Sequence, residues 1–574
     1  MAEWGFFISP VSVKAGPIQS RRVDPMTNGA QRTIEHILAQ GIETVVGIPG
    51  GNILPLYDAI HGSRLRHILA RHEQGAGFIA QGMARATGKP AVCLATSGPG
   101  ATNLVTALAD AEHDAVPIVA ITGAVPRDRK GMRSFQEADI ASIARPCVKA
   151  AWEIRNAAEL DTILPLAFHT ARSGRPGPVL VDIPRDVFRE TAAPWLPPTP
   201  HRESRREISP ESVTSALEML GEAKRPLLLA GGGLSRSGSS IAREFTEATG
   251  IPVAWTLHGL GAIPSTHPSS LGMIGMHGNP AANLALSECD LLIVAGARLE
   301  ERAIGEGHRF APKARLMRLD ADARQMRMHR ADLAIEGDAA QALEALLEGM
   351  RELRFPRWPS GHDNMPPHHP PGRGPAHHLL RTIAEAMGPD TLWTTDVGQH
   401  QMWAAQSLPI SRSRQFLTSG GFGTMGFGMP AAIGASLATQ GSPVGCIAGD
   451  GSILMNIQEM ATLAELGLPV KIFLLDNGGL GMVRQQQDLF YGSRQSACGF
   501  QTALDFAKIA RGFGIAGLNV RPDQIEDDGW RRLAQAPGPA LISFRIEAEE
   551  KVWPVVRPGQ NLHDMIHQPI AETA

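Results

Sequence analysis

A carboxylate and an amide lie 27 positions apart in this sequence, each where an apolar run gives way to glycine. Asp450 stands in the segment AGDGS, and Asn477 closes the segment VKIFLLDN. Both apolar runs are typical of parallel strands, whose carboxyl ends form the crevice where ligands bind in open α/β sheets. A carboxylate, an amide oxygen and a nearby backbone carbonyl would make a hard oxygen site. The pattern therefore predicts a Mg²⁺ site that leaves positions for diphosphate oxygens.

The glycines around Asp450 favour the same interpretation. They would let backbone amides approach a phosphate closely, and an amphipathic helix predicted after Ser452 would offer its positive end. A lone Gly-Asp-Gly is most often a turn. The triplet followed at this distance by Asp-Asn, with strand, helix and strand in order, is a much more specific signal.

This segment resembles the thiamine-diphosphate signature of pyruvate decarboxylases, pyruvate oxidases and acetohydroxyacid synthases. By that resemblance Asp450 and Asn477 bind Mg²⁺, and the carbonyl of Gly479 is the third protein ligand. The segment departs from the family at Asp476, where the family has asparagine. The resemblance also implies cofactor contacts at Gly449, Gly451, Ser452 and Met482.

A second cluster lies near the amino terminus, within RHEQGAGFIAQGMARATGKPAVCLATSGPGATN at residues 71–103. It resembles the pyrimidine-binding domain of the same enzymes. Glu73 corresponds to the glutamate that hydrogen-bonds the aminopyrimidine ring and favours its imino tautomer. By the same resemblance Gly51, Phe135 and Gln136 belong to the active site.

From about Met26 to Met565 the chain resembles the catalytic subunit of acetohydroxyacid (acetolactate) synthase, most nearly the bacterial isozyme I branch. The segments DVGQHQMWAAQ and TSGGFGTMGFGMPAAIGA match the cofactor loops of that family. In it, the carbonyl of Gly423 would hold the aminopyrimidine, and Met425 would bend the cofactor into a V. The residues implied to meet the diphosphate are Val397, Gly398, Gln399 and His400.

The middle of the chain resembles the FAD-binding region of these synthases, in which the flavin does no redox chemistry. Asp320, at the end of a predicted strand, would meet the adenosine ribose. The other residues implied to bind FAD are Gly231, Gly232, Thr256, Leu257, Gly275, Met276, His277, Gly296, Arg298, Glu300, Arg302 and Asp338.

Two residues are expected to select the second substrate. Arg302 would pair with the carboxylate of the acceptor keto acid. Gln486 stands where most synthases carry a tryptophan that favours 2-ketobutyrate. Our hypothesis is that Gln486 leaves little preference, so that pyruvate is used about as readily. Other departures from the family pattern cluster around the predicted entrance, at Met132, Arg133, Ser134, Ala150 and Arg185.

The resemblance implies a transferase that decarboxylates pyruvate on thiamine diphosphate and condenses the hydroxyethyl carbanion with pyruvate or 2-ketobutyrate. This is the first common step of branched-chain amino acid biosynthesis. The alternative is another thiamine-diphosphate-dependent decarboxylase, oxidase or carboligase with a different acceptor. A non-catalytic paralogue is disfavoured because Glu73, Asp450, Asn477 and Arg302 are all retained.

The 574 residues are too many for one core, and helical patterns alternate with apolar runs throughout. We therefore expect an α/β fold of three domains, each an open parallel sheet flanked by helices. The expected ranges are 1–25 disordered extension (with Met26 as an alternative start), 26–190 pyrimidine domain, 191–210 linker, 211–351 central FAD-binding domain, 352–376 proline- and histidine-rich linker, 377–555 diphosphate domain and 556–574 tail.

Composition limits the partners. A net charge of −3 and a pI of about 6.7 give no electrostatic case for nucleic acid or a membrane surface. No apolar run approaches the roughly 20 residues of a membrane span. Five widely spaced cysteines are typical of reduced thiols in a cytoplasmic protein. The resemblance implies a homodimer or homotetramer with active sites shared between Glu73 of one chain and Asp450 of another, and a possible small regulatory subunit.

Overall fold

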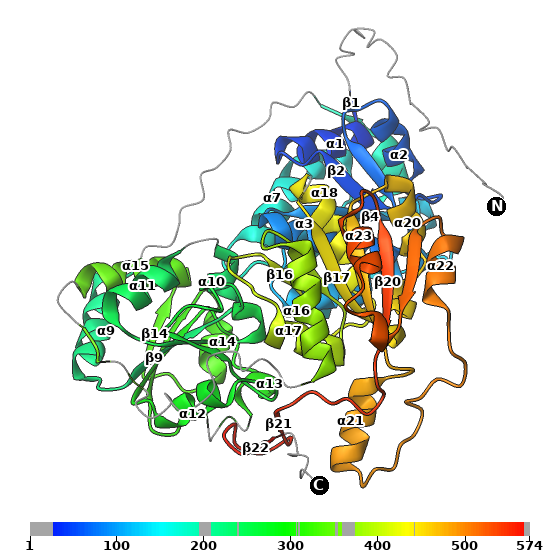
Figure 1. Cartoon of the computed structure of the whole chain (residues 1–574). Helices are drawn as coiled ribbons and strands as arrows, with labels where there is room; N and C mark the ends of the chain where they lie inside the picture. The colour runs from blue at the N-terminus through cyan, green and yellow to red at the C-terminus, as the bar shows by residue number, and fades with distance from the viewer. Residues whose placement is uncertain are drawn as a thin grey trace, which may run out of the picture.

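The structure, a computed structural model, describes residues 27–193, 208–237, 240–305, 307, 310–350, 354–356, 358, 374–440 and 442–567. The predicted extension at 1–25 and most of both predicted linkers lie outside these ranges. Three six-stranded sheets, parallel in every pairing, form the body of the molecule (Figure 1). The expected α/β class with three parallel sheets is confirmed.

The N-terminal sheet has the strand order β3-β2-β4-β5-β7-β6. Every residue of β4 and β7 is buried, as expected for apolar runs covered by helices on both faces. The strands are β2 (Thr44–Gly47), β3 (Arg66–Leu69), β4 (Ala91–Ala95), β5 (Ile118–Ala124), β6 (Ala150–Glu153) and β7 (Val179–Pro184). The helices are α1 (Gly29–Ala39), α2 (Leu54–His61), α3 (Glu73–Thr87), α4 (Pro99–Thr102), α5 (Val105–His113), α6 (Ile140–Ala144), α7 (Leu160–Arg172) and α8 (Arg185–Arg189).

The central sheet lies to one side of the other two (Figure 1, green) and has the order β11-β10-β9-β12-β13-β14. Its strands are β9 (Pro226–Ala230), β10 (Val253–Trp255), β11 (Ser270–Met273), β12 (Leu291–Ala295), β13 (Arg315–Asp320) and β14 (Leu333–Glu336). Its helices are α9 (Pro210–Glu222), α10 (Gly232–Ser237), α11 (Ile241–Thr249), α12 (Pro280–Glu288), α13 (Glu301–Ile304), α14 (Ala323–Met328) and α15 (Ala339–Gly349).

The C-terminal sheet has the order β16-β15-β17-β18-β20-β19, which repeats the topology of the N-terminal sheet. Its strands are β15 (Leu392–Thr395), β16 (Phe416–Leu417), β17 (Val444–Gly449), β18 (Val470–Asp476), β19 (Ala516–Val520) and β20 (Ala540–Arg545). Its helices are α16 (Pro375–Met387), α17 (Gln399–Ser407), α18 (Gly428–Thr439), α19 (Asp450–Ile453), α20 (Glu459–Leu466), α21 (Gly481–Phe490), α22 (Phe506–Gly512) and α23 (Asp528–Gln535).

The strand order reverses between β2 and β4 in the N-terminal sheet, between β9 and β12 in the central sheet, and between β15 and β17 in the C-terminal sheet. At such a switch point the two neighbouring loops leave in opposite directions and open a crevice at the carboxyl ends of the strands. The predicted site segments begin at these crevices. Gly51 follows β2, Gly231 and Gly296 follow β9 and β12, and Val397 and Asp450 follow β15 and β17.

Helices α3 and α18 join the N-terminal and C-terminal sheets by an unusually close crossing. A Cβ atom on Gly434 would lie 1.9 Å from the carbonyl oxygen of Ile79, and one on Gly82 would lie 2.1 Å from that of Ala431. Only glycine allows this approach. Ile79 and Ile433 belong to one hydrophobic cluster, so the two sheets share a core across the crossing.

The end of the chain returns to the central sheet as a hairpin of β21 (Val555–Val556) and β22 (Met565–Ile566) (Figure 1, red). The Nδ2 of Asn283 donates to the carbonyl of Leu562 at 3.0 Å. The last short pairing joins β1 (Thr27–Asn28) to β8 (Thr191–Ala192). Among the described residues, no helix is both long and apolar enough to cross a membrane.

Candidate active site

One cavity of about 1430 Å³ lies between the central sheet and the C-terminal sheet. It brings together two groups of predicted residues that are far apart in the sequence. The group from the C-terminal part is Val397, Gly398, Gln399, His400, Gly423, Met425, Gly449, Asp450, Gly451, Ser452, Asn477, Gly479, Met482 and Gln486. The group from the central part is Gly232, Thr256, Leu257, Met276, His277, Gly296, Arg298, Glu300, Arg302, Asp320 and Asp338.

Asp450 is held rigidly at the end of β17. Its Oδ2 accepts from the amide of Gly479 at 2.9 Å, and its Oδ1 accepts from the amide of Gly451 at 3.1 Å. Burial raises the pKa of Asp450 to about 7, and the neighbouring Asp476 carboxylate adds to the shift. A divalent cation beside these carboxylates would offset the cost of burying their charge.

Asn477 offers a buried oxygen with no partner. Its Nδ2 donates to the Oε1 of Gln399 at 3.0 Å, which fixes the amide so that Oδ1 points away. That Oδ1 has no hydrogen-bond partner among the described residues. A buried acceptor without a partner is costly, and a bound cation would remove that cost. The Oδ1 of Asn477 therefore fits its predicted role as a Mg²⁺ ligand. The charge of Asp476, the departure from the family pattern, is paired with Arg545 at 2.9 Å.

The predicted diphosphate loop contains a second buried atom without a described partner, the Nε2 of His400. Its ring lies against Gly449, where a Cβ atom would meet Nδ1 at 2.7 Å. Burial lowers the pKa of His400 to about 3. The side chain of Gln399 bonds to Asn477, Gln485 and the carbonyl of Glu550, so it orients the predicted Mg²⁺ ligand Asn477.

The helix expected after Ser452 differs from the prediction. Helix α19 begins at Asp450 itself and spans only four residues. A 3₁₀ turn at Leu454–Asn456 follows, and the amphipathic helix α20 starts only at Glu459. Within this 3₁₀ turn, the side-chain Nδ2 of Asn456 donates to the carbonyl of Gly426 at 3.0 Å.

The half of the cavity lined by the predicted FAD-binding residues, here called the flavin half, contains several anchored side chains. His277 is buried against the carbonyl of Pro554 at 3.1 Å, and burial lowers its pKa to about 4. Asp338 caps α15 by accepting from the amides of Ala340 and Gln341. Arg302 is half exposed in the cavity wall, where an anion could reach it. Burial raises the pKa of Asp320.

Gly231 and Gly275 do not line this cavity. A Cβ atom on Gly231 would lie 2.2 Å from the carbonyl oxygen of Gly296, so this glycine allows β9 and β12 to approach at the switch point. The amide of Gly275 donates to Asn283 at 2.9 Å, which shapes the loop that carries Met276. Both residues support the cavity wall from behind.

Glu73, Gly51, Phe135 and Gln136 form a separate cluster that does not line the cavity of the same chain. Glu73 accepts from Asn103 at 3.0 Å and lies beside Gly100. Gln136 packs against Gly98, two residues before Gly100. Phe135 is 86% exposed, which leaves a large apolar side chain in solvent.

A residue of the C-terminal region, Glu459, forms hydrogen bonds to the backbone just before the helix that carries Glu73. The Oε1 of Glu459 accepts from the amides of Arg71 and His72, at 2.9 Å each. Glu459 itself is fully buried. Its contact therefore fixes the two residues that lead into α3.

Sequence reasoning missed cationic residues in the cavity wall. Arg175 lies in the turn between α7 and β7 and bonds to Glu112 at 2.5 Å. Arg236 donates to the carbonyl of Asp114 at 2.6 Å, and burial lowers its pKa to about 10. The side chain of His258 lines the same wall. The segment SGRPGP predicts that Arg175 lies in a turn. Nothing in the neighbouring sequence predicts that this turn lies close to the central sheet.

Three domain families match the chain in order. Residues 27–143 match the N-terminal TPP (thiamine pyrophosphate) binding domain of thiamine pyrophosphate enzymes, residues 213–346 the central domain, and residues 396–544 the C-terminal TPP binding domain.

Curated relatives match over nearly the whole length. The acetolactate synthase isozyme 1 large subunit of Escherichia coli (strain K12) is 45% identical over 94% of this chain and 97% of its own. The isozyme 2 large subunit of the same organism is 43% identical over 94% of this chain and 100% of its own. The acetolactate synthase large subunit of Parasynechococcus marenigrum (strain WH8102) is 42% identical over 94% and 91%. The chain therefore belongs to the acetolactate synthase large-subunit family of thiamine pyrophosphate enzymes.

Proposed function

We propose that this protein is an acetolactate synthase that decarboxylates pyruvate and joins the resulting two-carbon unit to a second 2-keto acid. The observation that carries the proposal is the single cavity, because it collects the predicted diphosphate, metal and flavin residues on one surface. The reaction is the first common step of branched-chain amino acid biosynthesis. The acceptor is pyruvate or 2-ketobutyrate.

Asp450, Asn477 and the carbonyl of Gly479 hold Mg²⁺, which in turn ties down the diphosphate of thiamine diphosphate. Support comes from the unpartnered Oδ1 of Asn477 and from the bonds that orient Asp450. His400 and the amides after β15 and β17 provide further diphosphate contacts. When bound, thiamine diphosphate supplies the electron sink for decarboxylation. The protein contributes orientation, exclusion of water and the carboxylate of Glu73.

The central sheet holds FAD. Its strand order is the one in which dinucleotides bind at the switch point, here between β9 and β12. Gly232 and Gly296 line the cavity at the ends of those two strands. Arg302 receives the acceptor carboxylate, which fits its half-exposed position between the flavin and thiamine halves.

Two chains complete each active site, with Glu73 supplied by the partner. Support comes from the position of Glu73 outside the cavity of its own chain and from the large exposed side chains of Phe135 and Met132. Such a shared site makes a homodimer the smallest active unit, and a tetramer is two of these. A small regulatory subunit is proposed because the relatives are named large subunits. The proposed location is the cytoplasm.

The test is an assay of the purified protein with pyruvate, Mg²⁺, thiamine diphosphate and FAD, with products identified by mass. Acetolactate formation is expected, and it should stop when Mg²⁺ is chelated and resume when Mg²⁺ is added back. Release of acetaldehyde or acetate without acetolactate would instead identify a decarboxylase or an oxidase.

A further inference from the structure

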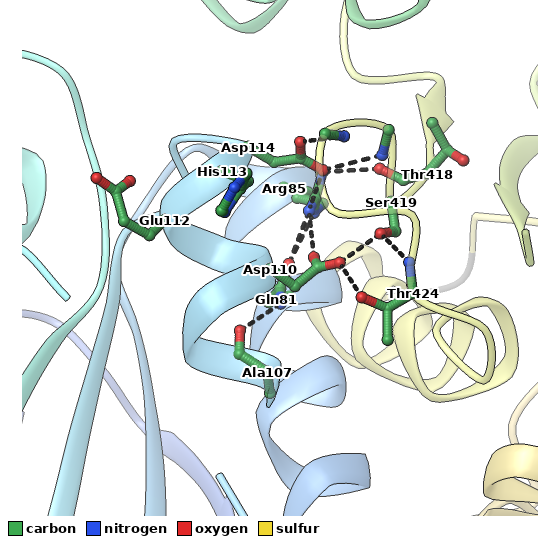
Figure 2. A network of polar contacts seen from close by, with 12 residues as sticks. Gln81, Arg85, Ala107, Asp110, Glu112, His113, Asp114, Thr418, Ser419 and Thr424 are labelled. Atoms are coloured by element: carbon green, nitrogen blue, oxygen red, sulfur yellow. Dashed lines mark hydrogen bonds and ion pairs between the residues drawn. The ribbon is translucent and has the colours of Figure 1, made fainter. Parts of the chain in front are cut away.

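Two buried carboxylates, Asp110 and Asp114, lie where three parts of the chain meet, beside the loop of residues 418–424 (Figure 2). Both come from the end of α5, and both side chains are 0% exposed. Neither was among the predicted site residues. Since buried charges require partners, the partners of this pair indicate what it does.

Asp114 binds two consecutive backbone amides of the loop. Its Oδ1 accepts from the amide of Gly421 at 2.8 Å, and its Oδ2 accepts from that of Gly420 at 3.1 Å. The Nη2 of Arg85 lies 2.9 Å from Oδ2. The Nε2 of His258, from the central part of the chain, lies 2.9 Å from Oδ1. One carboxylate thus connects α3, the loop and the flavin half of the cavity.

Asp110 binds the two hydroxyl groups that flank the loop tip. Its Oδ2 accepts from the Oγ1 of Thr424 at 2.8 Å and from the Oγ of Ser419. Ser419 in turn accepts from the amide of Thr424 at 2.8 Å. Arg85 completes the cluster by donating to the carbonyl of Thr418 at 2.9 Å. The start of the loop is therefore tied to both carboxylates, and its end is tied to Asp110 (Figure 2).

The loop tip has the opposite character. Thr418 and Ser419 are buried, whereas Phe422 is 46% exposed and Gly423 is exposed. Phe422, Gly423 and Met425 all line the cavity. The tip contacts the cavity while its base is fixed, so the positions of Gly423 and Met425 depend on the base.

An ionised carboxylate suits this task better than an amide. Burial would raise the pKa of Asp114, but His258 and Arg85 hold it well below the usual range. Burial and the charge of Asp114 raise the pKa of Asp110. Asp114 accepts at both oxygens, and an asparagine would turn an N–H group toward two of those donors.

We propose that Asp114, supported by Asp110 and Arg85, is a positioning residue that fixes residues 418–424 so that Gly423 and Met425 face thiamine diphosphate. The inference rests on the proposed function, since that function assigns Gly423 and Met425 to the cofactor. A loop ordered before binding avoids the entropic cost of ordering it during binding. Loosening the base should therefore weaken cofactor affinity.

The test compares Asp114→Asn with the wild type by two measurements. Hydrogen exchange of the cofactor-free protein reports the order of the loop, and titration calorimetry reports the affinity for thiamine diphosphate with Mg²⁺. We expect faster exchange in peptides covering residues 415–427 and an affinity at least about tenfold lower, or about 1.4 kcal/mol. Unchanged exchange together with unchanged affinity would overturn the inference.

A control variant breaks a partly buried ion pair away from the loop. Asp161 pairs with Arg32 at 2.6 Å and with His36 at 2.9 Å in the N-terminal region. Asp161→Asn should lower the unfolding temperature but leave loop exchange and cofactor affinity as in the wild type. If it weakened cofactor binding equally, the effect of Asp114→Asn would be general destabilisation and the inference would fail.

A second pair of variants keeps the inference testable if Asp114→Asn does not fold. Thr424→Val removes the hydroxyl that donates to Asp110, and Thr424→Ser retains it. The valine variant should show faster loop exchange and weaker binding, and serine should restore both; equal behaviour of the two would overturn the inference. A wild type that bound no thiamine diphosphate would overturn the proposed function instead, while the cofactor-free exchange would still decide the loop contacts.

Discussion

At the scale of single residues, the proposed Mg²⁺ site depends on one amide oxygen. The Oδ1 of Asn477 is buried and without a described partner, and Gln399 fixes its direction. Mutation of a residue that only orients a metal ligand lowers metal affinity about 10–100-fold, so loss of a direct ligand should lower it more. We expect Asn477→Ala to weaken Mg²⁺-dependent thiamine diphosphate binding at least about 100-fold, measured by calorimetry.

The control for that variant is Asn519→Ala. Asn519 is exposed on β19 of the same sheet, and its Nδ2 donates to the Oδ1 of Asp505 at 2.8 Å. The affinity of the Asn519→Ala variant for the cofactor should equal that of the wild type. Wild-type affinity in Asn477→Ala would remove Asn477 from the metal site.

Acceptor preference is also a single-residue question. Gln486 lies on α21 and lines the cavity, where a tryptophan would add apolar contact with the extra methylene of 2-ketobutyrate. A methylene contributes about 1–3 kcal/mol in such a pocket. We expect Gln486→Trp to raise, about tenfold or more, the ratio of the product formed with 2-ketobutyrate as acceptor to the product formed with pyruvate. Mass analysis of a mixed-substrate assay measures this ratio. Gln495→Trp, at an exposed position, should leave the ratio unchanged.

At the scale of elements, the crossing of α3 and α18 holds the N-terminal and C-terminal sheets together. A Cβ atom at Gly434 would lie 1.9 Å from the carbonyl oxygen of Ile79, so Gly434→Ala must push the helices apart. Overpacking of this kind costs about 1–3 kcal/mol or more. We expect a lower unfolding temperature, measured by calorimetry, together with weaker cofactor binding.

Gly221 provides the matched comparison. It lies in α9, and a Cβ atom there would meet no atom within 4 Å. Because alanine favours helices over glycine by about 1 kcal/mol, Gly221→Ala should keep or raise the unfolding temperature. An equal loss of stability in both variants would show that the crossing is not the cause.

At the scale of the whole molecule, the shared active site can be tested by complementation. Glu73→Gln and Asp450→Ala should each be inactive alone. In a mixed dimer, one site carries both lesions and the other carries neither. Random mixing places half of the chains in mixed dimers, so reassembly should restore about a quarter of wild-type acetolactate synthesis. If Glu73 served the cavity of its own chain, mixing would restore no activity.

The sequence by itself determined the local parts of this protein. Strands β4, β12 and β18 follow from short apolar runs, because burial on both faces requires continuous apolar side chains. The positions of Asp450 and Asn477 at strand ends follow from the same runs. The order of the three sheets along the chain also follows from the sequence, because each sheet is built from one continuous segment.

Only the tertiary structure decided which of these parts meet. Gln399 orients Asn477, Glu459 fixes the turn before Glu73, and Asp114 holds Gly420, over separations of 78 to 387 positions. Such contacts have no periodic signal, because packing of whole sheets and helices creates them. The position of Glu73 outside its own cavity likewise depends on how the domains are arranged in space.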